Sequence, residues 1–406
     1  MLTLPSRPWQ GAAATERTRD RFVERAEPST AALRLETWQF APANRHAFVA
    51  VDTLLPCAWI RGAGDAALPL PADALHRAED LRLGAPDSLD RLLPRLEHLY
   101  VDGLAVLRGD ELLLEYYGGE LTPARRHLCW SVSKTVTGLI AGQLVADGAL
   151  REDSTVASLV PALADSGWAS ATLSSLLDMR DAAVWNEDYG SHDEAAPAEA
   201  GPGSVAESTV RRQDRAMGLL PALAGDTPQG GRRFLATIEA DARLAGTFRY
   251  RSGCTDVAAW MLEAATGRSF PALVQDRLWS RFAADEACWI TDARDFALAS
   301  GGLCCTLRDL ARLGVLLARG GDRVLPSEWV ASLSDAAAGY RRFTWTLGEG
   351  RFEARGVHGQ RLHVGRDGLV IALFSSWPDA DGGAAGVDED AVTELVEDLE
   401  GHFRGR

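Results

Sequence analysis

Residues 129–135 read CWSVSKT, and this segment holds the only lysine among the 42 lysine and arginine residues of the chain. Lysine and arginine differ most in their ability to release a proton. A buried ammonium group loses its proton readily, whereas a guanidinium stays charged at any working pH. The single lysine, Lys134, therefore indicates a residue that acts as a base. A codon bias towards arginine is the alternative explanation for this composition.

Ser131 lies three residues before Lys134, at the start of a predicted helix over residues 131–149. Residues three apart share one face of a helix, with Cβ atoms roughly 5–6 Å apart, which suits a hydroxyl nucleophile activated by an amine. A backbone N–H in the first turn has no partner within the helix, so that of Ser131 is predicted to be one oxyanion donor. Ser-x-x-Lys also occurs by chance in helices, so the prediction depends on the lysine being the only one.

The strand and helix patterns predict one α/β domain assembled from the two ends of the chain, with a helical lobe inserted between them. We expect residues 37–150 and 301–406 to form the α/β domain and residues 151–300 to form the helical lobe. Residues 1–36 are expected to be a poorly ordered lead or a surface helix, and residues 186–208, rich in Gly, Pro, Ala and acidic side chains, an active-site loop. The predicted strands are 104–107, 111–117, 343–347, 352–357, 360–364 and 369–375, and the further helices are 255–266, 306–319 and 391–403.

The composition limits the classes of partner. The chain of 406 residues has a net charge of −15 and a pI of about 5.0. Nucleic acids and anionic membranes both bind basic surfaces, so we expect neither as a partner and predict a small-molecule substrate. No run reaches the ~18 apolar residues of a membrane span and residues 1–10 lack a signal-peptide pattern, so a cytoplasmic location is expected. The six cysteines and eight histidines lack metal-ligand spacing, so neither a metal nor another cofactor is expected, and nothing indicates an oligomeric state.

Tyr250 lies just before the predicted helix 255–266. A serine activated by lysine needs a second group that carries its proton to the leaving atom. A tyrosinate beside an ammonium group suits this role, because the positive charge lowers the phenol pKa. The alternative for a tyrosine at a turn is simple packing.

Residues 354–360 read ARGVHGQ, at the end of one predicted strand and the start of the next. The glycines permit close approach of the backbone to a ligand, and a strand N–H beside the nucleophile supplies a second oxyanion donor. An ordinary Gly-rich hairpin is the alternative.

With these three segments in place, the chain resembles the serine β-lactamase and penicillin-binding-protein superfamily of Ser-x-x-Lys enzymes. Within it, the chain is similar to the class C β-lactamase-like hydrolases typified by 6-aminohexanoate-dimer (nylon oligomer) hydrolases and related esterases. The resemblance begins near residue 37 and rests on WQ at 38–39, NR at 44–45, WSVSK at 130–134, LLDMR at 176–180, EDY at 187–189, YRS at 250–252, GGL at 301–303 and GVHGQ at 356–360. It implies a β-lactamase/transpeptidase-like fold, with an antiparallel sheet flanked by helices.

The resemblance also implies roles for individual residues. Ser131 would be the nucleophile, and Lys134 and Tyr250 the proton-transfer pair. The backbone N–H groups of Ser131 and Val357 would form the oxyanion hole, and Tyr189 would contact the leaving amine. The other expected substrate contacts are Ser252, Arg355, Gly356 and His358.

Two positions depart from the superfamily pattern. The third motif of β-lactamases is Lys-Thr/Ser-Gly, whereas residues 354–356 read ARG, and the tyrosine motif ends in Ser252 instead of Asn. The lysine that binds the substrate carboxylate is therefore missing, which weakens the expectation of β-lactam recognition. Arg355 either replaces that charge or points to solvent.

The predicted function is that of a serine hydrolase that forms an acyl-enzyme on Ser131 and cleaves an ester or amide of a small molecule. Acyl transfer is the first alternative, because an amine or alcohol can intercept the same acyl-enzyme before water does. The second alternative is a non-catalytic binding protein with the same fold. That alternative predicts loss of catalytic side chains, whereas Ser131, Lys134 and Tyr250 are all present.

Overall fold

A seven-stranded antiparallel sheet lies at the centre of the computed structural model, which describes residues 33–83, 91–189, 207–223, 227–383 and 386–404. Its strand order is β3-β2-β11-β10-β9-β8-β7, and a second sheet has the order β1-β5-β6-β4. The strands are β1 (Cys57–Ile60), β2 (Val101–Arg108), β3 (Glu111–Tyr117), β4 (His127–Leu128), β5 (Ala287–Ile290), β6 (Leu303–Cys305), β7 (Tyr340–Arg341), β8 (Thr344–Gly348), β9 (Arg351–Gly356), β10 (Gln360–Val364) and β11 (Leu369–Ser375).

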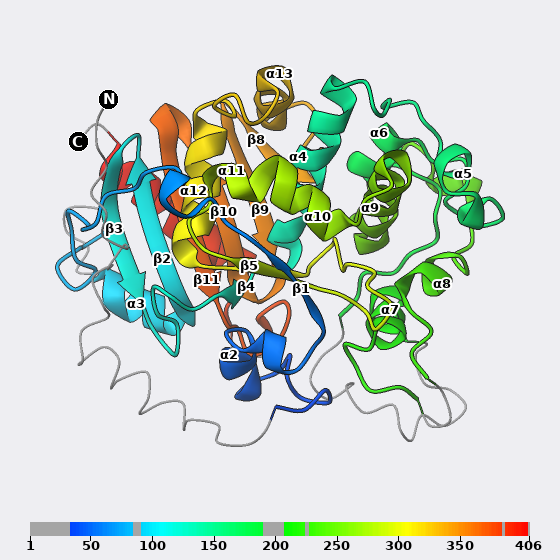
Figure 1. Cartoon of the computed structure of the whole chain (residues 1–406). Coiled ribbons are helices and arrows are strands. Elements are labelled where there is room, and N and C mark those ends of the chain that lie inside the picture. Colours follow the sequence, from blue (N-terminus) through cyan, green and yellow to red (C-terminus); the bar gives the residue numbers. More distant parts are fainter. Residues whose placement is uncertain (1–32, 84–90, 190–206, 224–226, 384–385, 405–406) are drawn as a thin grey trace.

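The large sheet joins segments near the two ends of the described chain. β2 and β3 form a hairpin whose turn contains Gly109 at a φ of 56°, a conformation that glycine enters without strain. β11 pairs with β2 along its length, so the segment near residue 370 lies beside the segment near residue 105 in the sheet. Figure 1 shows these strands on one side of the molecule and helices α5 to α9 on the other.

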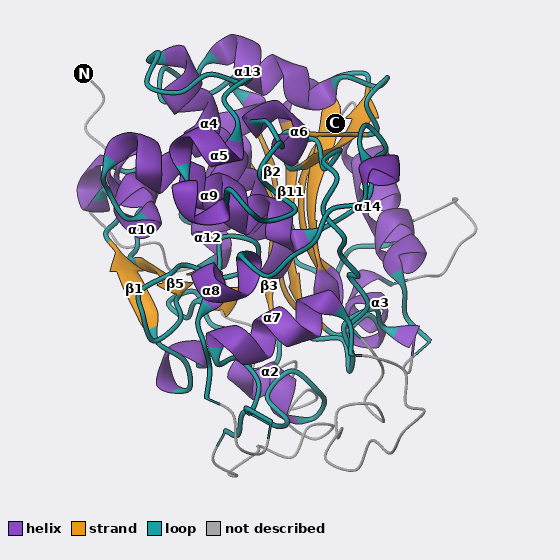
Figure 2. Cartoon of the chain, turned by 90° about the vertical axis from the view of Figure 1, so that its right-hand side faces the viewer, coloured by secondary structure: helices purple, strands orange, loops and turns teal. Residues whose placement is uncertain are grey.

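Helices cover both faces of the sheet. Side chains alternate along β11, so that Ala372 and Phe374 belong to the main core while Ile371 and Leu373 belong to a second core with α3 and α14 (Figure 2). The helices are α2 (Ala43–Ala47), α3 (Leu92–His98), α4 (Ser133–Ala146), α5 (Val156–Leu159), α6 (Leu173–Leu177), α7 (Thr209–Met217), α8 (Gly231–Leu235), α9 (Ser252–Thr266), α10 (Phe270–Val274), α11 (Ser280–Phe282), α12 (Leu307–Ala318), α13 (Ser327–Ala331) and α14 (Glu389–Phe403). The predicted antiparallel sheet with flanking helices is confirmed.

The small sheet differs from the prediction, because β5 lies inside the range 151–300, for which we expected helices. Its strands are only two to four residues long, too short for a recognisable alternating pattern in the sequence. The sheet has a direct role in placing Ser131. β4 pairs with β6, and the next residue, Cys129, donates its backbone N–H to Leu303 O at 2.8 Å, so the chain enters residues 130–134 from a fixed strand.

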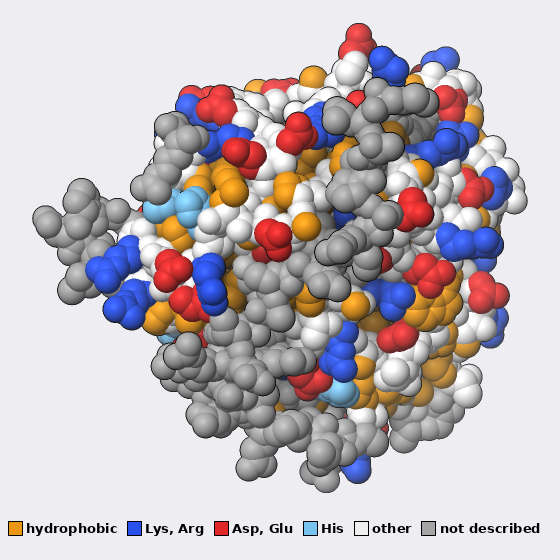
Figure 3. Space-filling model, turned by 60° about the vertical axis from the view of Figure 1, so that its left-hand side comes forward, with side chains coloured by type: hydrophobic (Ala, Val, Ile, Leu, Met, Phe, Trp, Pro, Cys, Tyr) orange, Lys and Arg blue, Asp and Glu red, His pale blue; other side chains and the backbone are white. Residues whose placement is uncertain are grey.

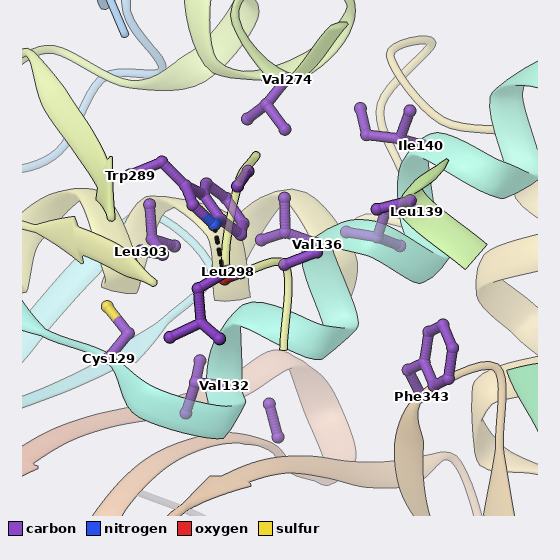
Figure 4. Packing of buried hydrophobic residues seen from close by; sticks show 14 of the residues in the cluster. Cys129, Val132, Val136, Leu139, Ile140, Val274, Trp289, Leu298, Leu303 and Phe343 are labelled. Carbon is purple, nitrogen blue, oxygen red and sulfur yellow. Dashed lines mark hydrogen bonds between the residues drawn. The ribbon is translucent and has the colours of Figure 1, made fainter. Parts of the chain in front are cut away.

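Helix α4 follows at once and is buried over residues 133–144. Val136, Leu139 and Ile140 pack among residues that include Trp289 and Leu303 (Figure 4). Two glycines let neighbouring segments approach this helix: a Cβ on Gly138 would lie 2.3 Å from Arg342 O, and one on Gly142 would lie 2.6 Å from the Trp329 ring. A helix packed on all sides has little freedom to shift, so the first turn of α4 is a rigid base for functional side chains.

The surface carries both signs of charge. On the face in Figure 3, acidic and basic side chains are interspersed between apolar ones. Within the described ranges, none of the helices combines the length and the apolar composition that crossing a membrane requires. The predicted lead (residues 1–36) and the predicted loop (residues 186–208) fall largely on residues outside those ranges.

Candidate active site

Ser131 and Lys134 are in direct contact. Lys134 Nζ lies 2.6 Å from Ser131 Oγ and also donates to the backbone oxygen of Ser300 at 2.8 Å. Ser131 belongs to a short 3₁₀ turn, η3 (Trp130–Val132), and Lys134 to the first turn of α4, so α4 begins two residues later than predicted. The lysine side chain is buried, while 7% of Ser131 remains exposed. The i, i+3 spacing therefore places the amine against the hydroxyl, as the sequence predicted.

The backbone before the nucleophile has an unusual conformation. Trp130 has a φ of 47°, in the left-handed region that non-glycine residues rarely occupy. Its ring stacks with Trp38 at 5.5 Å and with His358 at 5.6 Å between ring centroids. Strained backbone of this kind persists only where packing enforces it, and it occurs preferentially at functional sites. The aromatic stack therefore fixes the turn that presents Ser131.

His358 lies in the core, contrary to the predicted substrate contact. Only 2% of the residue is exposed, its ring packs against Phe48 and Trp130, and its Nδ1 lies 2.9 Å from Trp377 O. The backbone at His358 turns through a φ of 60°, which directs the ring behind Trp130 and not towards Ser131. The ring supports the nucleophile turn, and a substrate has no access to it.

Tyr250 lies beside both members of the pair. Lys134 Nζ is 5.0 Å from the centroid of the Tyr250 ring, and both Ser131 and Lys134 are near enough to the phenol to act on its pKa. The next residue anchors the segment, because the buried Arg251 donates to Ala183 O at 2.8 Å. The structure thus brings the three predicted catalytic side chains together from η3, α4 and the residue before Arg251.

The ionisation of Tyr250 differs from the prediction. Burial raises the pKa of the phenol, and the charge of Glu187 raises it further. The charge of Lys134 and hydrogen bonding with Ser131 and Lys134 lower the pKa, but burial outweighs them. Tyr250 is therefore a neutral phenol at pH 7, and not the tyrosinate that we expected. The sequence indicated the positive neighbour but contained no measure of burial.

An aromatic layer covers the other side of Tyr250. The Trp345 ring, on β8, is stacked on the Tyr250 ring at 5.7 Å with an interplanar angle of 10°, and Arg355 lies over Trp345 at 5.4 Å. The Arg355 guanidinium also pairs with Glu353 at 2.7 Å, and 25% of its side chain is exposed. Arg355 therefore neither points freely to solvent nor reaches the Ser131–Lys134 pair, and packs over the aromatic layer instead.

Glu187 connects the predicted substrate contacts Tyr189 and Ser252. Its Oε1 accepts hydrogen bonds from both hydroxyl groups, that of Tyr189 at 2.8 Å, and its Oε2 accepts from Ser252 N and from Trp185 Nε1 at 2.8 and 2.6 Å. Burial and the nearby charge of Glu187 raise the pKa of Tyr189 well above its usual value, and Tyr250 contributes in the same direction. The two predicted contacts therefore lie together, next to Tyr250.

Gly356, at the end of β9, lies against the backbone of Ser131. A Cβ at this position would be 3.0 Å from Ser131 N and 2.8 Å from Cys129 O. Its φ of −139° is accessible to any residue, so the close approach, and not backbone conformation, explains the glycine. Val357 follows directly, at the start of the 3₁₀ turn η10 (Val357–Gly359). The predicted close approach of this strand is present.

Four residues at the site had no predicted role: Glu187, Asp256, Ser300 and Trp345. Glu187 belongs to the EDY motif at 187–189, one of the motifs of the family resemblance. The sequence therefore contained a signal for this residue, although no function was predicted for it. Asp256 and Ser300 act through contacts between α9 and the segment before β6, and no local pattern marks them. Long-range contacts of this kind become visible only in three dimensions.

The described part of the chain contains no group of three or more His, Cys, Asp or Glu side chains arranged to bind a metal ion. All six cysteines are free thiols, and five of them are buried. Cys129 and Cys305 lie 3.4 Å apart between sulfur atoms within the core. The buried cysteines therefore pack as small apolar residues.

The buried His358 predicts a specific loss of stability in acid. Burial lowers its pKa from 6.5 to about 4, although the hydrogen bond to Trp377 O acts in the opposite direction. The unfolded chain takes up the proton first, so this contribution to stability is complete above pH 6.5 and is lost as the pH falls towards 4. We expect a loss on the order of 3 kcal/mol from this histidine.

Urea unfolding of wild type and His358→Gln between pH 7 and pH 4 measures this effect. The free energy of unfolding should fall more steeply with decreasing pH in wild type than in the variant, because glutamine does not titrate. Parallel curves for the two proteins would show that the pKa of His358 is the same in the folded and the unfolded state.

Comparison with known proteins agrees with this geometry. The sequence profile of the β-lactamase family matches residues 90–387, well over half of the chain. The 6-aminohexanoate-dimer hydrolase of Paenarthrobacter ureafaciens is 35% identical over 371 residues, which cover 86% of this chain and 89% of that relative.

Solved structures share the fold. A Bacillus anthracis protein assigned as a 6-aminohexanoate-dimer hydrolase has a TM-score of 0.80 and 24% identity, over 92% of this chain and 98% of that one. EstCE1, described as a hydrolase with promiscuous acyltransferase activity, has a TM-score of 0.53 and 16% identity, over 74% and 97% of the two chains. The profile and the sequence relative together confirm the resemblance that the motifs indicated: the chain belongs to the β-lactamase family, as one of its serine hydrolases.

Proposed function

We propose that Ser131 is the nucleophile of this hydrolase and forms an acyl-enzyme with a small ester or amide, with Lys134 as the base. The observation that carries the proposal is the 2.6 Å contact between Lys134 Nζ and Ser131 Oγ. The lysine is 1% exposed, and Ser300 O accepts a hydrogen bond from its Nζ. A neutral amine in this position has its lone pair available for the serine proton.

In the first half-reaction, Ser131 Oγ attacks the carbonyl carbon while its proton passes to Lys134 Nζ. The negative charge on the carbonyl oxygen is stabilised by the backbone N–H groups of Ser131 and Val357. The close approach of Gly356 to Ser131 N supports this pairing of donors. Each donor acts without reorganisation, because both belong to backbone that is fixed by packing.

Tyr250 completes the proton transfer. Its raised pKa keeps the phenol protonated, so it donates its proton to the leaving oxygen or nitrogen and recovers one from the Lys134 ammonium. The bond between the carbonyl carbon and the leaving atom then breaks and leaves the ester of Ser131. Water hydrolyses that ester by the reverse proton path, which releases the acid and restores the neutral lysine.

We further propose that a linear amide of an aliphatic amino acid, such as the 6-aminohexanoate dimer, is a substrate. The support is the 35% identity to a hydrolase named for that compound. The Tyr189 and Ser252 hydroxyl groups, held by Glu187, provide polar contacts beside Tyr250, where the leaving amine departs. Arg355 is engaged by Glu353, so a carboxylate site equivalent to that of β-lactamases is not part of the proposal.

Labelling with a fluorophosphonate tests the nucleophile. We expect mass spectrometry to find one adduct, on Ser131, in wild type and none in Ser131→Ala. Ser158→Ala is the matched control, because Ser158 is an exposed serine on α5 that bonds only its own turn through Thr155 O in the contacts seen, and it should leave labelling unchanged. An adduct on another residue, or no adduct in wild type, would refute the assignment.

A substrate panel separates hydrolysis from acyl transfer. Wild type should release free acid from p-nitrophenyl esters and from the 6-aminohexanoate dimer. The same reactions with an added primary amine show whether water is the acceptor: acid remains the main product of a hydrolase, whereas a new amide would identify a transferase.

A further inference from the structure

Asp256 and Ser300 form a continuous hydrogen-bonded chain behind Lys134. Asp256 Oδ1 accepts from Ser300 N at 2.9 Å, and Oδ2 accepts from Ser300 Oγ at 3.0 Å. The backbone oxygen of the same serine accepts from Lys134 Nζ at 2.8 Å. The chain therefore runs from Asp256 on α9, through Ser300, to Lys134 on α4 and on to Ser131.

The aspartate itself is fixed from a second side. Gln213, on α7, donates Nε2 to Asp256 Oδ2 at 2.6 Å, and neither Asp256 nor Gln213 is more than 1% exposed. Ser300 is also buried, with 4% exposure. Residues from α7, from α9 and from the segment at Ser300 therefore meet at the Asp256 carboxylate. This carboxylate accepts hydrogen bonds from both the N–H and the hydroxyl of Ser300.

The contact with Ser300 matters because a lysine amine is flexible. The ammonium group lies at the end of four methylene groups and rotates freely, so its hydrogen atoms have no preferred direction of their own. In the neutral amine, one N–H directed at Ser300 O leaves the lone pair free to face Ser131 Oγ. The position of the Ser300 carbonyl therefore decides how well the base is aimed, and the two bonds to Asp256 decide where that carbonyl lies.

We propose that Asp256 is a positioning residue of the reaction, which acts through Ser300 to aim the Lys134 amine at Ser131 Oγ. The inference rests on the proposed role of Lys134 as the base. Asp256 itself touches neither the substrate nor the reacting atoms. It lies on α9, one turn beyond the predicted substrate contact Ser252, so it links this helix to the base.

The charge of Asp256 has a second consequence. Burial raises the pKa of this carboxyl to about 6, while Gln213, Ser300 and the charge of Lys134 act in the opposite direction, so the group is anionic above neutral pH. The charged groups that face it are Lys134 on α4 and Asp214 on α7. Asp256 therefore changes its charge within the pH range of an activity profile.

The variant Asp256→Asn tests the proposal, because asparagine keeps the volume and one oxygen that accepts from Ser300 N. We expect kcat to fall by about tenfold to hundredfold, since a small misplacement of a catalytic group has effects of this size. KM should change less than twofold. The acid limb of the kcat/KM profile should lose the contribution of Asp256, whose pKa is about 6, because asparagine does not titrate.

Two further variants distinguish positioning from general stability. Ser300→Ala removes only the hydroxyl contact with Asp256 and should lower kcat by a few-fold, with no change in the pH profile. Asp309→Asn is the matched control, because Asp309 is another buried carboxylate that accepts two backbone N–H groups, those of Ala284 and Asp285 at 2.7 and 2.9 Å. It should lower the melting temperature without altering kcat or the pH profile.

Each outcome has a distinct meaning. A folded Asp256→Asn protein with the kcat and pH profile of wild type would overturn the positioning role, while an intact fluorophosphonate adduct on Ser131 would leave the proposed function standing. Absence of that adduct in wild type would refute the proposed function itself. If Asp256→Asn does not fold, Ser300→Ala decides the question, because unchanged kcat in that variant would refute the chain through Ser300.

Discussion

Lys134→Arg is expected to lower kcat/KM for a p-nitrophenyl ester by about 10³-fold, which is the usual range for loss of a general base. Arginine keeps the positive charge but cannot give up its proton, so it cannot accept the proton of Ser131. Its longer planar group also cannot reproduce the two contacts of Nζ, with Ser131 Oγ at 2.6 Å and Ser300 O at 2.8 Å. Steady-state hydrolysis and the rate of fluorophosphonate labelling, both between pH 6 and pH 9, measure the loss.

Folding of the variant must be established separately, because the lysine is buried in α4. Circular dichroism and a melting curve provide that check. Lys134→Met is a second variant that fills the same space without a base, and it should show a similar loss. Labelling of Ser131 at the wild-type rate in either folded variant would show that another group activates the serine.

Gly356→Ala is expected to lower kcat by about 10²- to 10³-fold, the effect of losing one oxyanion donor. The new Cβ would lie 3.0 Å from Ser131 N and 2.8 Å from Cys129 O, and both are backbone atoms that cannot rotate away. β9 must therefore shift, and the N–H of Val357 moves with it. KM should change much less than kcat, because the donor acts mainly in the transition state.

Gly401→Ala is a suitable control for this substitution. Gly401 lies in α14, and a Cβ there meets no atom within 4 Å. Alanine is the better helix former, so this variant should retain full activity and equal or higher stability. If Gly356→Ala kept a kcat within threefold of wild type, the backbone of residues 356–357 would not form part of the oxyanion hole.

Local spacing was sufficient for the central pair of the site. Ser131 and Lys134 are three residues apart at the start of a helix, so their contact follows from helix geometry and needs no other part of the chain. The hairpin of β2 and β3 and the strands β8 to β11 were likewise predicted to within a few residues, because each has a clear pattern and a Gly-containing turn.

The environment of each side chain was not predictable in the same way. Tyr250 was correctly expected to lie beside Lys134, yet the sign of its pKa shift was wrong, because the rings of Trp345 and Tyr340 bury the phenol. His358 was expected to contact substrate, and its ring instead supports Trp130. Both errors concern burial, which depends on residues far away in the sequence.

By itself, the sequence determined the antiparallel architecture, the family and the proposed catalytic pair of Ser131 and Lys134, because these follow from short motifs and from periodic patterns within single elements. Tertiary structure alone decided that Asp256 and Ser300 stand behind Lys134, that Glu187 joins Tyr189 to Ser252, and that Tyr250 stays protonated. The physical reason is that hydrogen bonds across elements and the loss of solvent arise only when distant segments pack together, and neither leaves a regular spacing in the chain.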